Sequence, residues 1–232
     1  MNNLAIIPAR GGSKRIPRKN IKNFLGKPII SYSIEMAINS GLFSEVMVST
    51  DDLEIAEIAR KYGAKIPFFR SNEKSDDYTS TLDVLKEVLF RYKNLGVEFE
   101  NICCIYPCTP LCNSTNLLKA FELLTTSEFD TVFPVIPYSS PIQRALRVEN
   151  NNVKMIDTKF EKIRTQDLEA SYHDAGQFYW INCYNLFERN QIFSSNTGVI
   201  ILNELESQDI DNEIDWKLAE LKYTILHKKN GN

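Results

Sequence analysis

The sequence predicts an α/β fold built on a mostly parallel, doubly wound sheet. Short apolar runs alternate with amphipathic stretches of about 10–15 residues, which is typical of strands joined by crossover helices. Pro8 and Pro107 end two of the apolar runs, and Gly41 and Gly63 stand where two amphipathic stretches end. The alternation stops before the block 138–187, which is predicted to be an inserted β-rich arm.

The individual elements follow from the same patterns. Strands are expected where apolar residues cluster, at 3–8, 45–50, 65–68, 101–106, 131–136, 178–184 and 197–202. Helices are expected at 28–40, from 51 or 52 to about 63, and at 81–92, 114–126 and 213–227. Capping residues support the starts, namely Pro28, Asp51 or Asp52, Asn113 or Ser114, and Asn212. Within the arm, 143–149 and 153–157 flank a run of asparagines and predict a β-hairpin. Residues 1–137 and 188–232 would then form the α/β domain.

Composition excludes several classes of protein. The chain has 232 residues, of which 43% are hydrophobic and 25% charged, and no stretch approaches the roughly 18 apolar residues of a membrane span. The net charge of −3 gives no case for nucleic-acid binding. The first residues lack the regions of a signal peptide, and five cysteines without disulfide-framework spacing favour a reducing compartment. We therefore expect a cytoplasmic protein without nucleic-acid or membrane partners.

Charge is distributed unevenly along the chain. Residues 1–34 contain seven Lys or Arg and no Asp or Glu, whereas residues 203–220 contain seven Asp or Glu and a single Lys. One end is suited to hold an anion and the other a cation. The alternative is that both segments are solvated surfaces.

The loop after the first expected strand carries the strongest chemical signal. Residues 8–20 have the sequence PARGGSKRIPRKN, in which two adjacent glycines allow backbone N–H groups to approach an anion. Arg10 can bind phosphate oxygens in a bidentate manner, Lys14 and Lys19 supply point charges, and Ser13 offers a hydroxyl. The pattern is neither the P-loop nor the dinucleotide-binding fingerprint. The loop is suited to hold a pyrophosphate group, and a solvated basic loop is the alternative.

This loop resembles the signature of the acylneuraminate cytidylyltransferase family, which makes CMP-sialic acids from CTP. The likeness continues through Ser49–Asp52, Phe69-Arg70, the block 106–110 and Asp209-Ile210-Asp211. It implies a Rossmann-like nucleotidyltransferase fold and a homodimer formed through the arm. It also implies roles for the residues of the loop. Arg10, Ser13, Lys14 and Lys19 would contact the triphosphate, Gly11 and Gly12 would shape the loop, Arg15 would bind the nucleotide, and Asn20 would place the nucleotide or the attacking sugar. Arg10, Lys14 and Lys19 are the expected catalytic residues of this loop.

A second segment is expected to recognise the nucleobase. Selection of cytosine requires a donor for its carbonyl and an acceptor for its exocyclic amine. Arg70 can donate to the carbonyl, and a hydroxyl or backbone carbonyl near Thr79–Thr81 can accept from the amine. The resemblance supports Arg70, Thr79 and Thr81 for this role. The alternative for the 79–81 segment is that it caps the following helix.

Asp209 and Asp211 form a candidate metal site. In an extended segment, their two carboxylates face one side and Ile210 faces the core. Two carboxylates, completed by phosphate oxygens and water, suit Mg²⁺ (or Mn²⁺). A surface position is the alternative for an isolated Asp-x-Asp. The resemblance favours the metal role and makes Asp211 a catalytic residue.

A distinctive stretch is expected to contact the sugar. Residues 164–169 and 172–180 resemble the branch of the family that activates pseudaminic acid. His173-Asp174-Ala175-Gly176 replaces the Arg-x-Asn-Gly of enzymes for N-acetylneuraminate, and Tyr106 replaces their Gln. Candidate sugar-binding residues are Tyr106, Arg164, Gln166, His173 and Gln177. Arg164 and Gln166 could act across a dimer interface, and a positioning role suits His173 better than catalysis.

The implied reaction joins CMP to a nine-carbon acidic keto-sugar. Its anomeric hydroxyl attacks the α-phosphorus of CTP, and pyrophosphate leaves without a covalent enzyme intermediate. The alternatives are a related enzyme for N-acetylneuraminate, legionaminate or Kdo, and a CTP-binding regulator without turnover. The arm leaves room for an added structural role.

Overall fold

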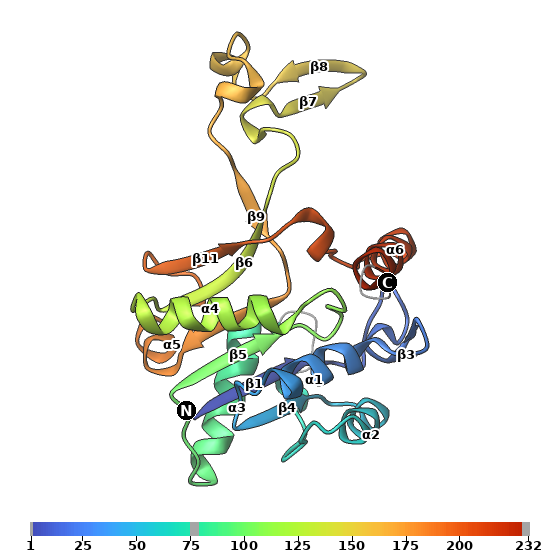
Figure 1. Ribbon diagram of the computed structural model, residues 1–232, viewed down its shortest axis with the longest axis vertical. Coiled ribbons are helices and arrows are strands. Elements are labelled where there is room, and N and C mark those ends of the chain that lie inside the picture. The colour runs from blue at the N-terminus through green and yellow to red at the C-terminus, as the bar shows by residue number, and fades with distance from the viewer. Residues whose placement is uncertain (1, 75–78, 229–232) are drawn as a thin grey trace.

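The structure is a computed structural model that describes residues 2–74 and 79–228 (Figure 1). The strands are β1 (Asn3–Pro8), β2 (Asn23–Phe24), β3 (Lys27–Pro28), β4 (Glu45–Ser49), β5 (Asn101–Ile105), β6 (Thr131–Pro137), β7 (Leu146–Glu149), β8 (Asn152–Met155), β9 (Tyr172–Asp174), β10 (Phe178–Asn182) and β11 (Thr197–Ile201). The α-helices are α1 (Ile29–Ser40), α2 (Leu53–Lys61), α3 (Thr81–Asn94), α4 (Ser114–Thr126), α5 (Cys183–Arg189) and α6 (Glu213–Lys228). None of the helices in the described part of the chain has the length and apolar character needed to cross a membrane.

The predicted mostly parallel sheet is confirmed. Its order is β11-β6-β10-β5-β1-β4, with β9 paired to β6. Strands β1, β4, β5, β6 and β11 share one direction, and β9 and β10 run the opposite way. The chain passes from β1 to β4 on one side and returns to β5 on the other side of β1. The topological switch point, where sheets of this kind bind ligands, therefore lies between β1 and β5.

Helices cover both faces of the sheet, as expected for a doubly wound fold. Helices α1, α2 and α4 pack on one face in a core cluster that includes Trp180. Helices α3 and α5 pack on the other face around Leu4, Ile6 and Met47. The capping predictions hold as well, because the Asp52 and Asn113 side chains accept hydrogen bonds at the starts of α2 and α4. Gly41 ends α1 in the left-handed conformation with φ of 67°.

Three sequence predictions of the fold were wrong. Residues 65–68 form no strand, because only Lys65 makes an isolated bridge, to Met47. The expected strand 178–184 ends at Asn182, whose side chain caps the unpredicted helix α5. The arm was expected to reach residue 187, but β9 and β10 pair within the main sheet. A strand buried in the middle of a sheet cannot be separated from an inserted arm by apolar pattern alone.

The segment that projects from the body spans about residues 138–171 (Figure 1). Its predicted hairpin is confirmed as β7 and β8, joined by Asn150 and Asn151. Both asparagines have positive φ, 49° and 63°, as the favoured two-residue hairpin turn requires. The apolar side chains of this hairpin are largely exposed, with Val148 at 69% and Val153 at 59%.

A third core cluster joins the two ends of the chain. Ile16, from the basic loop, and Ile210, between the two aspartates, are only 1% and 2% exposed, and both belong to this cluster. Trp216 of α6 and Phe24 of β2 also belong to it, with ring centroids 5.6 Å apart. Burial of these apolar side chains favours the approach of two segments that lie about 190 residues apart in the sequence.

Candidate active site

A cavity of about 360 Å³ lies at the switch point of the sheet. It is lined by the basic loop, by the segment after β5 and by the aspartate segment. The candidate residues among its lining are Arg10, Ser13, Lys14, Arg15, Lys19, Asn20, Tyr106, Asp209 and Asp211. Most of the residues predicted for phosphate and metal binding therefore meet in one place.

Gly11 holds the beginning of the basic loop against α2. Its N–H donates to Asp51 Oδ1 at 3.0 Å, and a Cβ at this position would lie 2.7 Å from Asp52 Oδ2. Asp52 in turn accepts from the Arg18 guanidinium, with Arg18 Nη2 3.0 Å from Oδ1. Arg18 holds the pKa of the Asp52 carboxyl below its ordinary value. Only glycine fits between the strand end and this ion pair, whereas Gly12 has no neighbour within 4 Å of such a Cβ.

Asn20 supports the loop from inside. Its Nδ2 donates to the Arg10 carbonyl at 2.9 Å, and its Oδ1 accepts from Cys108 Sγ at 3.3 Å. Burial raises the pKa of the Cys108 thiol to about 12, so the thiol keeps its proton and remains a donor. Both amide atoms of Asn20 are thus engaged in fixing the loop. Cys108 is a lining residue that sequence reasoning missed, although it lies in the block 106–110.

The basic loop and the acidic segment are linked directly by polar contacts. Lys19 Nζ donates to the Ile210 carbonyl at 2.7 Å, and Arg15 Nη1 lies 2.5 Å from Asp211 Oδ2. One turn further, Lys22 Nζ lies 2.6 Å from Glu213 Oε1. These contacts bring positive and negative groups to the same cavity, as a site for a metal-bound triphosphate requires.

The two aspartates have the alternation expected for the motif. Asp209 and Asp211 line the cavity, and the Ile210 side chain is buried in the core. Burial and the neighbouring Asp211 raise the pKa of the Asp209 carboxyl, against the opposite effect of Lys19 and Arg15. Asp215, one of two acidic residues of the first turn of α6, accepts from the Asp211 N–H at 2.9 Å and so fixes the segment.

The donor set fits a hard divalent cation. A cation between the carboxylates would offset the burial and the repulsion from Asp211 that raise the pKa of the Asp209 carboxyl. Within residues 2–74 and 79–228, no group of three or more His, Cys, Asp or Glu side chains could hold a metal. Further ligands would therefore come from the phosphates and water.

Arg70 lies outside the cavity, directly beneath the end of β4. It is 8% exposed, and its Nε and Nη2 donate to the Ser49 hydroxyl and carbonyl at 3.0 and 2.6 Å. Burial lowers the pKa of its guanidinium. These contacts fix Arg70 beside the end of β4, and the structure does not bring it into the lining of the cavity.

The segment at the start of α3 contains the other nucleobase candidates. Ser80 accepts from the Asp83 N–H and is the N-cap, so helix capping requires neither Thr79 nor Thr81. Thr81 Oγ1 lies 3.3 Å from the Tyr106 hydroxyl, and Thr79 is half-buried. The adjoining residues 75–78, which belong to the predicted nucleobase segment, lie outside the described residues.

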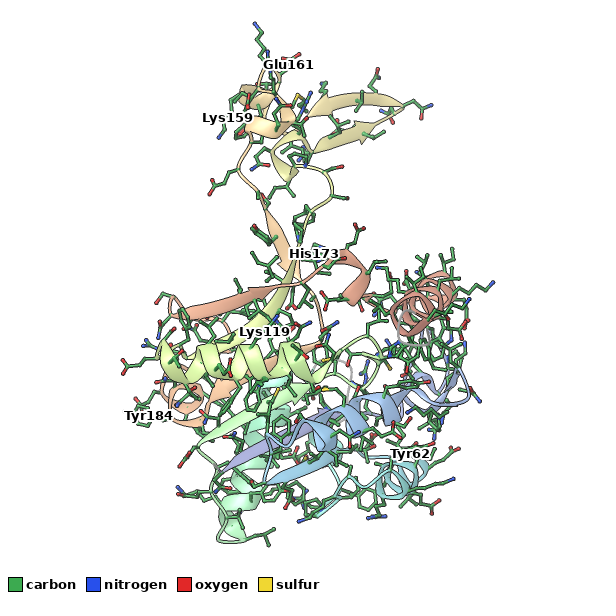
Figure 2. All side chains as sticks on the ribbon, in the orientation of Figure 1. Tyr62, Lys119, Lys159, Glu161, His173 and Tyr184 are labelled. Atoms are coloured by element: carbon green, nitrogen blue, oxygen red, sulfur yellow. The ribbon has the colours of Figure 1, made fainter. Side chains whose placement is uncertain are left out.

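The sugar candidates are divided between the cavity and the arm. Tyr106 lines the cavity. Gln177 is 3% exposed beside it, and its Nε2 donates to the Glu206 carbonyl at 2.6 Å. His173, in β9, lies at the base of the projecting segment (Figure 2), where its ring centroid lies 4.9 Å from that of Tyr138. Arg164 and Gln166 lie in the arm, and neither lines the cavity of its own chain.

The comparisons with known proteins agree with this geometry. Residues 4–224 match the family model described as cytidylyltransferase. The pseudaminic acid cytidylyltransferase of Campylobacter jejuni is 45% identical over 229 residues, which cover 98% of this chain and 99% of that protein. The CMP-N,N'-diacetyllegionaminic acid synthase of Legionella pneumophila is 31% identical over 230 residues, covering 95% of each chain.

A solved structure shows the same fold. CMP:2-keto-3-deoxy-manno-octonic acid synthetase, complexed with CTP, superposes with a TM-score of 0.69 at 17% sequence identity, covering 98% of this chain and all of that one. At this identity the likeness supports the fold alone. The match to the family model and the 45% identity over nearly the whole sequence show that the chain belongs to the cytidylyltransferase family.

Proposed function

We propose that the protein transfers CMP from CTP to the anomeric hydroxyl of pseudaminic acid and releases pyrophosphate. The observation that carries this proposal is the convergence of the basic loop and the aspartate pair on one cavity. A protein that only bound CTP would not require both. The relative with 45% identity along its whole length supports pseudaminic acid as the acceptor, and the legionaminic acid synthase, at 31%, is more distant.

The basic loop binds and orients the triphosphate. Arg10, Lys14 and Lys19 take the charge of the β- and γ-phosphates, which leave as pyrophosphate, and Ser13 donates its hydroxyl. The backbone at Gly11 and Gly12 lets the phosphates approach closely. Arg15 of the loop pairs with Asp211, so its guanidinium can bind either the phosphates or this carboxylate.

Asp209 and Asp211 would hold a divalent cation, Mg²⁺ or Mn²⁺. When bound there, the cation supplies charge neutralisation at the α-phosphate and favours ionisation of the attacking hydroxyl. The protein contributes the two carboxylates and the Asp215 contact that fixes them. Arg70, Thr79 and Thr81 bind the cytosine, and Asn20 keeps the loop in place beside it.

The sugar site is completed by a second copy of the chain. Tyr106, Gln177 and His173 belong to the body of the protein. Arg164 and Gln166 lie in the arm, away from the cavity. The exposed apolar hairpin of the arm is suited to packing against another copy. A homodimer would bury this surface and bring the arm of one protomer to the cavity of its partner. Five free cysteines suit the cytoplasm, where CTP is available.

Pyrophosphate release tests this function. We would incubate the protein with CTP, Mg²⁺ and, in parallel, pseudaminic, N-acetylneuraminic, legionaminic and Kdo acids. The expected result is fastest release with pseudaminic acid and none after chelation of the metal. Equal or faster turnover of N-acetylneuraminate would reject the sugar assignment. CTP binding without pyrophosphate release in the presence of any of the sugars would identify a regulator instead of an enzyme.

A further inference from the structure

A second cavity, of about 370 Å³, adjoins the candidate active site. The two cavities share Gln208 and Asp209 in their linings, so the second cavity begins at the aspartate segment. Its other walls come from the end of β6, from β9 with His173 (Figure 2), from the segment 204–207 and from α6. A ligand in the active site can therefore extend past Asp209 into this second cavity.

Lys222 of α6 supplies the positive charge of the second cavity. Among the described residues that line the cavity, it is the single Lys or Arg. Lys222 is half-buried, and its Nζ donates to the Glu204 carbonyl at 2.9 Å and to the Ser207 carbonyl at 2.7 Å. Both acceptors are neutral backbone groups, so they hold the ammonium in place without neutralising its charge. An ammonium has three N–H donors, and the third is available to a ligand in the cavity.

The other formally charged side chains of the lining are carboxylates. They belong to Asp174, Glu204 and Asp209. Both oxygens of Asp174 already accept hydrogen bonds from the protein. An anionic group of a ligand is repelled by these carboxylates and attracted by the ammonium of Lys222. The cavity therefore favours one position for such a group, beside Lys222.

The acceptor of the proposed reaction carries its negative charge next to the reacting atom. In a 2-keto sugar acid, the carboxylate carbon is bonded directly to the anomeric carbon, whose hydroxyl attacks the α-phosphorus. A sugar whose hydroxyl faces the aspartate pair therefore also brings its carboxylate close to Asp209. We propose that Lys222 binds this carboxylate and thereby restricts the acceptor to 2-keto sugar acids. This inference rests on the proposed function, which supplies the acidic sugar.

The test compares pseudaminic acid with its carboxamide in the Lys222→Met variant. The carboxamide has nearly the shape of the carboxylate but no charge, and methionine fills much of the space of lysine without its ammonium. We expect the unmodified protein to prefer the acid, measured as the ratio of kcat/KM for acid and amide at saturating CTP. In Lys222→Met this ratio should fall by roughly ten- to a hundredfold, the range for a hydrogen bond to a charged group. The KM for CTP should remain unchanged.

Lys217→Met is the matched control. Lys217 belongs to the same helix, is exposed and lines neither cavity, so its loss should leave the ratio of acid to amide unchanged. Lys222→Arg keeps a cation and should retain part of the preference for the acid. If Lys222→Met does not fold, Lys222→Gln decides the question, because its amide can still donate to a backbone carbonyl but carries no charge.

Four outcomes would overturn the proposal. The first is equal loss for acid and amide in Lys222→Met, which would show that Lys222 only ties the segment 204–207 to α6. The second is an unchanged ratio in an active variant, and the third is equal use of acid and amide by the unmodified protein. The fourth is a ratio lost in Arg164→Gln but kept in Lys222→Met, which would place the carboxylate at the arm. Turnover of CTP with pseudaminic acid by the unmodified protein separates all four from failure of the proposed function.

Discussion

The cavity and the projecting arm differ in what their side chains contact within a single chain. Around the cavity, charged groups from both ends of the sequence pair at short distances, and Ile16 and Ile210 are buried beneath them. In the arm, the side chains of Leu146, Val148, Val153 and Ile156 are 58–69% exposed. On the proposed function, one chain would complete the phosphate and metal site, whereas the arm and the sugar contacts that it carries would require a second copy.

The largest expected effect is at the cavity. Asp211→Asn removes one of two carboxylates from the metal site and should lower kcat by roughly a thousandfold, the scale seen when a key charge-stabilising group is lost. Stability in urea should change little, because the Asp211 ion pair with Arg15 is exposed. Glu213→Gln, which removes a neighbouring ion pair with Lys22 outside the cavity lining, is the control and should remain active. Near-normal turnover by Asp211→Asn would contradict the role of Asp211 as a metal ligand.

The second effect concerns the arm. Val148→Asp places a charge on the exposed apolar hairpin, so dimers should dissociate while the body stays folded. Sedimentation should show a monomer, and turnover of the sugar should fall by at least about tenfold, or 1.4 kcal/mol, with CTP affinity retained. Phe90→Asp, a similar change at a side chain of α3 that is 61% exposed, serves as control. A dimer of full activity after Val148→Asp would show that the hairpin is not the interface.

A third prediction uses the two adjacent glycines. Gly11→Ala brings a Cβ against Asp52 and should lower the free energy of unfolding by about 1–3 kcal/mol, the usual result of overpacking. Gly12→Ala meets no protein atom within 4 Å and should leave stability nearly unchanged. Urea denaturation of both variants measures the difference. Equal stability of the two would mean that the loop shifts freely, contrary to the contacts of Asp52.

The smallest effect depends on pH. Because Arg18 lowers the pKa of Asp52 in the folded state, this pair stabilises the protein above the unfolded pKa of about 3.9. The contribution is lost as the pH falls from there through the lower folded pKa. It should amount to about 0.5–1 kcal/mol, since Arg18 is 39% exposed. In Asp52→Asn, the free energy of unfolding should fall by this much less as the pH is lowered. The same pH dependence as in the unmodified protein would contradict the role of the pair.

Patterns along the chain predicted most of the fold and the phosphate site. Apolar runs identified six of the main-sheet strands within two residues at each end, and capping residues identified the starts of α2, α4 and α6. Residues 65–68 were wrongly predicted to form a strand, because a short apolar run has the pattern of a strand even where only Lys65 pairs. Helix α5 was missed since its apolar residues continue the pattern of β10 without a break.

Local sequence by itself determined the chemistry of this protein. The cations and glycines of residues 8–20 and the spacing of Asp209 and Asp211 are properties of short segments, and the alternation of side chains decides which of them face outward. Only the tertiary structure decided that these segments meet, because their approach depends on burial of Ile16, Ile210, Phe24 and Trp216 in one cluster.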